Sequence, residues 1–355
     1  MFHHQHASKM LFNKNGIGAA EMKSILGFIY ASSTFENLAT DIELVTDEMI
    51  RLIGIDLYSE IESFYQSEHF DTQPGVVTPE EGAPTPLQTW KIWKELVHHT
   101  QLPIAFYAYR NYASHADLTH SDKGRQIFVS EFEKPAFEWM IQRDDQSLLL
   151  KAHKLTDRLL KFLDDHATDV KIKSTWTNLP VYAASKSNLI SSAQVFSDIF
   201  PIASSRRFYQ TVLPFIAEVE RTRIIPTISQ ANYDSLLEFI RSRSTGNETE
   251  TLLHMVRIPI VLYTMNIAAK RLAVEILPDG VFQNYVSGSQ TMKARNPAAM
   301  EFKTEIAKVL EDEANQAMTA LQQFMEKLSA AALGESFEPE ALTSRHSKDN
   351  QYFRL

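Results

Sequence analysis

The sequence predicts a mainly α-helical protein built from two tandem copies of one four-helix unit. Three observations support this fold class: residue spacings that recur far apart in the chain, apolar stripes with helical periodicity, and a globular composition. Hydrophobic residues make up 44% of the 355 residues and charged residues 22%, which is typical of a folded domain. The length is sufficient for two domains of ordinary size.

The internal repeat is visible at three places, where sets of five residues return 173, 156 and 162 positions later. The first set is Ala20, Ser24, Ile29, Ser32 and Phe35, matched by Ala193, Ser197, Ile202, Ser205 and Phe208. The second set is Leu96, His98, Pro103, Ile104 and Tyr107, matched by Leu252, His254, Pro259, Ile260 and Tyr263. The third set is Pro135, Ala136, Ala152, Leu159 and Phe162, matched by Pro297, Ala298, Ala314, Leu321 and Phe324. The repeat predicts four segments, namely a first helical unit over 11–166, an extended linker over 167–190, a second helical unit over 191–333 and an extended tail over 334–355.

Helical periodicity and turn residues give the elements of the first unit. We expect a short helix over 19–26 and a long helix over 35–65, which Gly54 bends or interrupts, because apolar residues recur there every three or four positions. A proline-rich loop over 67–86 follows, since closely spaced Pro and Gly residues oppose regular helix. A buried helix over 87–114 contains Pro103, which predicts a kink. The turn Asp122-Lys123-Gly124 predicts a small hairpin, and a last helix is expected over 135–165.

The second unit repeats this order. We expect helices over 192–199, 205–241, 249–276 and 297–333, with Pro259 inside the third and a turn at Pro278-Asp279-Gly280 before the fourth. Alternating β-type residues predict a short strand over 170–176. The repeat offset is 175 at Tyr58/Tyr233 but 156 at Pro103/Pro259, so the second copy is shorter between these marks. The missing material corresponds to the proline-rich loop, where insertions cost little free energy.

Composition excludes several classes of protein. The formal net charge of −9 argues against a surface dedicated to nucleic-acid phosphates. The chain has no cysteine, so neither disulfides nor thiolate metal sites can stabilise it, in agreement with a reducing cytosol. No apolar run approaches the roughly 20 residues of a membrane span, and the N-terminus lacks the apolar core of a signal peptide. We therefore expect a soluble protein without a membrane partner.

Candidate chemical groups are few. His98 and His99 are adjacent, so they point about 100° apart on a helix and do not chelate one ion together; with His254 they are interpreted as core or interface histidines. The acidic pairs Asp144-Asp145, Asp164-Asp165 and Glu80-Glu81, and the N-terminal His3, His4 and His6, are interpreted as solvated surface groups. Gly16-Ile17-Gly18 lacks the third glycine of a dinucleotide fingerprint. We predict no catalytic, cofactor-binding or metal-binding residue, and therefore no enzyme.

Some of these residues carry a family resemblance. The opening stretch from Leu11 to Phe35, the run Phe35…Ile53-Gly54-x-x-Leu57-Tyr58 and the Asp122-Lys123-Gly124 turn resemble an uncharacterised family encoded by tailed phages and prophages of Bacteroidetes. That family is similar to the small helical head–tail connector proteins of tailed phages. The resemblance covers most of residues 11–330 when both copies are counted.

The resemblance implies a structural virion protein of the neck, assembled in the host cytoplasm. Such proteins form a ring that joins the portal to the tail, so the implied partners are further copies of the chain, the portal protein and tail proteins, with passing contact to genomic DNA. The family implies a twelve-fold ring, whereas duplicated chains can offer twelve modules from six copies. The loop 67–86, the segment 167–190 and the tail are the elements expected to reach neighbouring proteins.

Two alternatives stay open at this point. The first is another phage adaptor or tail-end structural protein, and the second is a cytoplasmic helical module that binds a protein partner outside any virion. An enzyme is the least favoured class, because no convergent set of polar groups can be assembled from these residues.

Overall fold

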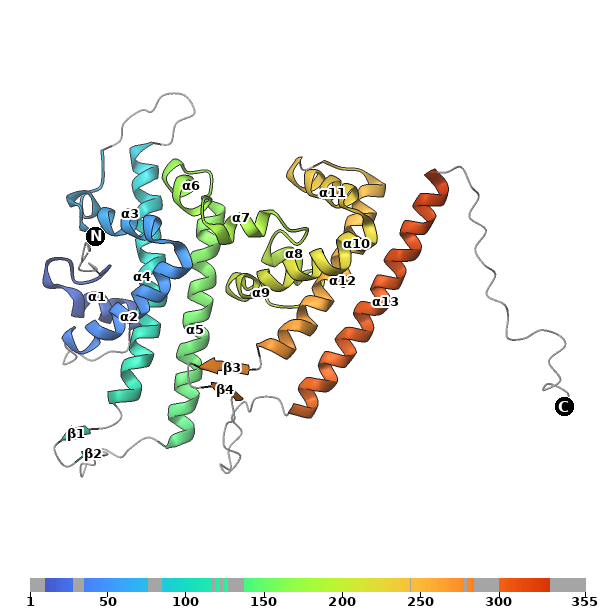
Figure 1. Ribbon diagram of the computed structural model, residues 1–355. Helices are drawn as coiled ribbons and strands as arrows, with labels where there is room; N and C mark the ends of the chain where they lie inside the picture. Colours follow the sequence, from blue (N-terminus) through green and yellow to red (C-terminus); the bar gives the residue numbers. More distant parts are fainter. Residues whose placement is uncertain are drawn as a thin grey trace, which may run out of the picture. The chain divides into compact units, whose positions relative to one another are not determined.

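The computed structural model describes residues 10–27, 35–75, 85–116, 119–121, 124–126, 137–242, 244–272, 274–277, 280–283 and 300–332. Over these residues the protein is mainly α-helical, which confirms the predicted fold class (Figure 1). The chain forms two compact units. The first contains the described chain up to Ser187 together with Ser191–Leu213, and the second contains Asn188–Ile190 and the described chain from Pro214 onward.

The helices of the first unit follow the predicted order. Its main helices are α1 (Gly18–Leu26), α2 (Glu36–Ile53), α3 (Ile55–Gln66), α4 (Pro86–Ala116) and α5 (Glu138–Asp165). Helices α4 and α5 run side by side and α2 packs on α4 (Figure 1). Their facing side chains form one apolar core, which includes Ile42, Leu96, Ile104, Leu159 and Leu163. Burial of this apolar surface is the main stabilising term for the unit.

The predicted interruption of the long helix at Gly54 is confirmed. Gly54 lies between α2 and α3 with φ of +89°, a conformation that glycine adopts without a Cβ clash. A Cβ at this position would also lie 2.6 Å from Cδ2 of Leu179. Backbone conformation and close packing therefore both require glycine here.

The proline-rich loop is described at its beginning, over 67–75, and at its end, where Pro86 begins α4. Residues 68–70 form the 3₁₀ turn η2 (Glu68–Phe70), and residues 76–84 lie outside the described part. Lys14 donates to the carbonyl of Ser67, and Lys94 donates to the carbonyl of Phe70 while lying 3.3 Å from the centroid of its ring. These contacts fasten the first residues of the loop to the helical core.

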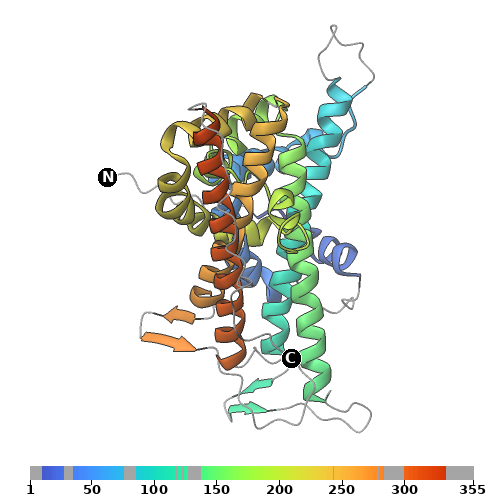
Figure 2. The same ribbon diagram turned by 90° about the vertical axis from the view of Figure 1, so that its right-hand side faces the viewer.

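A two-stranded antiparallel hairpin follows the proline-containing helix in each copy (Figure 2). In the first copy β1 (Thr119–Ser121) pairs with β2 (Gly124–Gln126), and in the second copy β3 (Val274–Leu277) pairs with β4 (Gly280–Gln283). The predicted first hairpin is thus confirmed by its two paired strands, and the turn predicted at 278–280 falls between β3 and β4. Residues 122–123 and 278–279 themselves lie outside the described residues.

The segment between the copies is not the extended linker that the sequence suggests. Residues 170–176 and 180–186 form helices α6 (Val170–Trp176) and α7 (Pro180–Lys186), so the predicted strand is wrong. The Asp169 carboxylate accepts from the backbone N–H groups of Lys171 and Ile172 and so caps α6. Ile172 and Trp176, four residues apart on one helical face, are buried in the core of the first unit. Helix α6 is therefore part of that core.

The helix predicted over 205–241 is divided in the structure. The chain passes through α8 (Ala193–Ser197), α9 (Arg206–Val219), the π-helical turn η3 (Glu220–Ile224), α10 (Ile225–Ile228) and α11 (Gln230–Ser242). Ser229, with φ of +75°, separates α10 from α11. It lies 175 positions after Gly54, so the two copies are interrupted at matched places.

The second unit is completed by α12 (Asn247–Arg271) and α13 (Met300–Ala332), which lie side by side (Figures 1 and 2). Helix α12 ends earlier than predicted because the chain enters β3, and α13 agrees with the predicted last helix. The described residues end at Ala332, so the predicted tail over 334–355 lies outside them. Helix α12 is long and apolar enough to cross a membrane over Glu248–Arg271, but 56% of its apolar 18-residue window is buried inside the protein, as expected of a core helix.

Candidate functional site

The predicted histidine candidates lie on the proline-containing helices. His98 is exposed and His99 is buried on α4, while the matched His254 is exposed on α12. Burial lowers the pKa of His99 to about 4, and the nearby Arg158 guanidinium acts in the same direction. Its ring packs 4.9 Å from that of Phe162. His99 is therefore a neutral core residue of the first unit, whereas His254 belongs to the second unit.

The members of the predicted acidic pairs differ in their surroundings and in their ion-pair partners. Asp144 is exposed, and Asp145 forms an ion pair with Arg110 at 2.7 Å. Asp165 pairs with Lys161 one helical turn away. In the described part of the chain no group of three or more His, Asp or Glu residues is placed to hold a metal ion. His3, His4, His6 and the pair Glu80-Glu81 lie outside the described residues.

Asp164 belongs to a hollow of about 430 Å³, including space open to solvent, on the first unit. Its carboxylate accepts from Nε1 of Trp176 at 3.2 Å and from Nε of Arg206 at 3.0 Å. The carboxylate and the guanidinium neutralise each other. These contacts fasten α6 and the start of α9 to the end of α5, which is a structural role.

In each copy, a side chain of the proline-containing helix donates a hydrogen bond to the backbone carbonyl of a buried leucine. We call these two places the leucine anchors. In the first copy the carbonyl oxygen of Leu11 accepts from Nε2 of Gln101 at 2.6 Å. In the second, the carbonyl oxygen of Leu189 accepts from Nε of Arg257 at 3.0 Å. Gln101 and Arg257 lie 156 positions apart, each two residues before the proline of its helix. Both leucines are fully buried.

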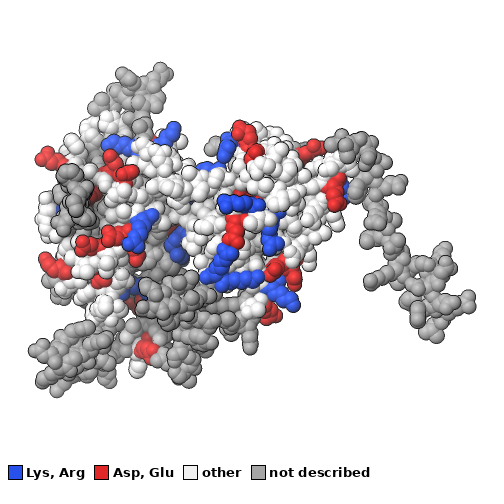
Figure 3. All heavy atoms as spheres, in the orientation of Figure 1, with Lys and Arg blue, Asp and Glu red and all other residues white. Residues whose placement is uncertain are grey.

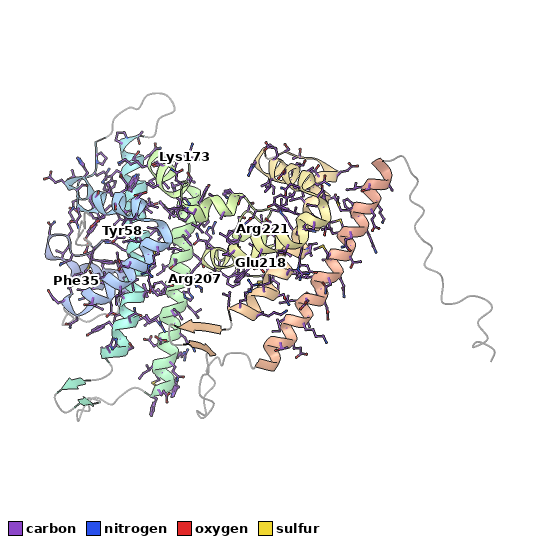
Figure 4. The ribbon with its side chains drawn as sticks, in the orientation of Figure 1. Phe35, Tyr58, Lys173, Arg207, Glu218 and Arg221 are labelled. Carbon is purple, nitrogen blue, oxygen red and sulfur yellow. The ribbon has the colours of Figure 1, made fainter. Side chains whose placement is uncertain are left out.

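A tyrosine belongs to each leucine anchor. Burial raises the pKa of Tyr58 and of Tyr233, and both side chains lie inside their units. Figure 4 shows Tyr58 among the helices of the first unit. In that copy the hydroxyl of Thr46 lies beside Tyr58. The anchors thus share a tyrosine, a leucine and a side-chain donor, although no residue pattern in the sequence alone marks them as a site.

The second leucine anchor differs by one buried carboxyl group. Glu220 is 2% exposed; its Oε1 accepts from the N–H of Leu189 at 2.8 Å and its Oε2 accepts from the Tyr233 hydroxyl at 2.7 Å. Burial raises the pKa of Glu220 to about 7, against the effect of these hydrogen bonds. The sequence analysis did not single out this residue, because a lone glutamate in an amphipathic helix is normally assigned to the solvent-exposed face.

The π-helical turn explains how Glu220 reaches the interior. The buried pair Val219 and Glu220 lies 174 positions after Val45 and Thr46, whereas Ile224 lies 175 positions after Met49. One extra residue therefore lies in the second copy after Glu220, where the π-helical turn accommodates it. This shift in the repeat offset is the sequence signal that could have indicated the position. Figure 4 labels the neighbours Glu218 and Arg221, which lie on the same stretch of helix.

The beginning of α5 carries exposed apolar side chains, which we call the α5 tip. Phe137, Trp139, Met140 and Ile141 have exposed fractions of 67%, 41%, 41% and 39%. Successive residues of a helix point in different directions, so these four side chains present apolar surface on several sides of the helix end, with the exposed Glu138 among them. Exposed apolar patches of this kind mark interaction surfaces, and Trp, Phe and Met are enriched at protein interfaces.

Several charged side chains on the described surface form ion pairs. Arg271 forms an ion pair with Glu218 and Lys270 with Glu311 on the second unit. Figure 3 shows acidic and basic side chains intermixed on that face. On the described part of this face, the mixture of signs gives no large field of one sign for binding a polyanion.

The fold and these sites define a duplicated helical protein with two leucine anchors and an exposed apolar helix end. The chain belongs to a family of unknown function (DUF6712), whose model matches residues 50–178 and 224–332, about two thirds of the chain. The matched stretches begin 174 positions apart, at equivalent places of the two copies, in agreement with an internal duplication. No curated protein and no solved structure matches the chain.

Proposed function

We propose that the protein is a structural component of a tailed-phage particle, a ring-forming connector that joins the portal to the tail. The α5 tip is the observation that carries this proposal, because its exposed Phe137, Trp139 and Met140 require a protein surface to cover them. The resemblance of the opening stretch and of the Gly54-x-x-Leu57-Tyr58 run to a phage family supplies the class of particle.

A ring needs heterologous contacts, in which one surface of a subunit binds a different surface of the next. The α5 tip lies at one end of the α4–α5 pair (Figure 1) and provides one side of such a contact. The rigid helical core of each unit keeps this surface in a fixed orientation. The proline-rich insertion, fastened at its base by Lys14 and Lys94, provides a second contact that only the first copy has.

The proposal is tested by measuring the mass of the purified full-length chain by native mass spectrometry and by imaging it with negative-stain electron microscopy. We expect closed rings at micromolar concentration, and the same polypeptide in mass spectra of purified virions. A chain that stays monomeric and is absent from virions contradicts the proposal. A monomer that binds one cellular protein at fixed stoichiometry supports the cytoplasmic binding module instead.

A pair of variants tests the α5 tip itself. Trp139→Glu is expected to abolish the rings, because it places a charge inside the proposed contact. Leu44→Glu is the matched control, because Leu44 is 57% exposed on α2 and lies on a different helix from the tip. Circular dichroism checks that both variants fold. Equal loss of rings in the two variants contradicts a role specific to the tip.

A further inference from the structure

The second leucine anchor holds a short segment of chain with an ionisable group that the first anchor lacks. Asn188–Ile190 is packed within the second unit, although the chain on both sides of it belongs to the first. Leu189 and Ile190 are fully buried and Asn188 is 5% exposed. The backbone of Leu189 is held from both sides, its N–H by Glu220 and its carbonyl by Arg257.

Burial of Glu220 favours the protonated form of its carboxyl group, although hydrogen-bond donors surround it. Tyr233 of α11 and the backbone N–H groups of Leu189 and Ile190 donate hydrogen bonds to this carboxyl group. The charges of Asp234 and Arg241, both on α11, shift the pKa of Tyr233 in opposite directions, Asp234 upward and Arg241 downward. Arg257 of α12 is directed at the carbonyl of Leu189. Hydrogen bonds from neutral donors offset only part of the cost of burying an anion.

A protonated Glu220 can keep the same geometry. Its unprotonated oxygen still accepts from the N–H of Leu189, and its O–H donates to the Tyr233 hydroxyl oxygen, since a hydroxyl is both donor and acceptor. Loss of the proton restores an anion in a buried site. The contacts of the segment are therefore most stable when Glu220 is neutral.

We propose that Glu220 is a proton-linked anchor, which holds Asn188–Ile190 firmly in the second unit while it is protonated and weakly once it is ionised. This proton-linked contact does not depend on the proposed ring, and it is specific to the second copy. In the first copy Thr46 occupies the matched place, and Gln101, which is not ionisable, replaces Arg257.

The direction of the pH dependence follows from proton binding. In the open state Glu220 is exposed to water and titrates near pH 4.5, whereas in the closed state its pKa is about 7. Between these values the closed state binds more protons, so opening becomes more favourable as pH rises. The opening constant should rise about tenfold per pH unit over this window, and level off above pH 7.

Hydrogen–deuterium exchange of the full-length chain tests this inference. The opening constant of a peptide that contains Leu189 and Ile190, corrected for the intrinsic exchange rate, is measured between pH 4.5 and 8. We expect a rise of about 100-fold or more in the wild type and no rise in Glu220→Gln. Glu218→Gln is the matched control, because Glu218 is two residues away and pairs with Arg271 at the surface; it should keep the wild-type rise.

Tyr233→Phe provides a second test that does not remove the carboxyl group. It deletes one donor to the carboxylate, so the pH at which the rise levels off should move upward. A wild type without the rise, a rise that persists in Glu220→Gln, or one that disappears in Glu218→Gln overturns the proposal. Rings with a normal appearance are compatible with each of these results, so failure of the anchor is distinguishable from failure of the proposed function.

Discussion

The buried His99 makes the first unit sensitive to acid. Its side chain is 7% exposed and its Nδ1 atom has no hydrogen-bond partner in the described structure. Its pKa is about 4 in the folded protein and about 6.5 in an unfolded chain. Between these values the unfolded state binds the extra proton, so the folded state loses stability as pH falls from 6.5 towards 4. The difference of about 2.5 pKa units corresponds to a loss of about 3 kcal/mol.

The second copy itself suggests the replacement for His99, because Met255 occupies the matched position. His99→Met removes both the ionisable group and the unpaired ring nitrogen. We expect it to stabilise the first unit by about 1 kcal/mol at pH 7.5, and by about 3 kcal/mol more at pH 4. His98→Gln is the control, because His98 is the adjacent histidine on the same helix but its side chain is exposed, so this variant should change the pH dependence less than His99→Met does.

Tryptophan fluorescence is well suited to this measurement. All four tryptophans, Trp90, Trp93, Trp139 and Trp176, belong to the first unit. Urea unfolding followed by their emission therefore reports that unit alone, and the free energy of unfolding is compared between variants at each pH. The reasoning is refuted if His99→Met and the wild type lose stability in parallel on acidification.

Other core positions give further predictions. Gly54→Ala should destabilise the first unit by about 1–3 kcal/mol, because its positive φ and the nearby Leu179 exclude a Cβ; an unchanged urea midpoint contradicts this. Ser229→Gly should stabilise the second unit by about 1 kcal/mol by relieving a strained backbone, as measured by circular dichroism, and a loss of stability argues against strain. Trp176→Ala should cost about 3–5 kcal/mol, since its ring is 2% exposed; a cost below about 1 kcal/mol shows that α6 is not part of the core.

The sequence predicted the parts of the fold that depend on local rules. Helical periodicity located the main helices, the glycine at residue 54 predicted a break, and turn residues predicted the first hairpin and a turn at the place of the second. The matched break at Ser229 was not predicted, because serine rarely adopts positive φ and only tertiary packing imposes it there. Helix α6 was missed because three β-type residues outweighed the capping signal of Asp169 and the apolar spacing of Ile172 and Trp176.

The candidate sites depend on contacts between distant parts of the chain, and these are not visible in residue patterns. Glu220 and Leu189 lie 31 positions apart, and nothing local to either residue indicates their hydrogen bond. The apolar character of residues 137–141 was visible, but not its exposure. Periodicity alone assigns such residues to a core, whereas the fold decides whether another element covers them.

Two of the differences between the copies concern ionisable groups at buried places. The first copy has His99 where the second has Met255, and the second has Glu220 where the first has Thr46. A buried base and a buried acid respond to protons in opposite senses. Acidification from pH 6.5 to 4.5 should therefore weaken the core around His99 while it strengthens the anchor around Glu220. Exchange rates of both regions, read from the same samples, test this argument, and a change of both in one direction contradicts it.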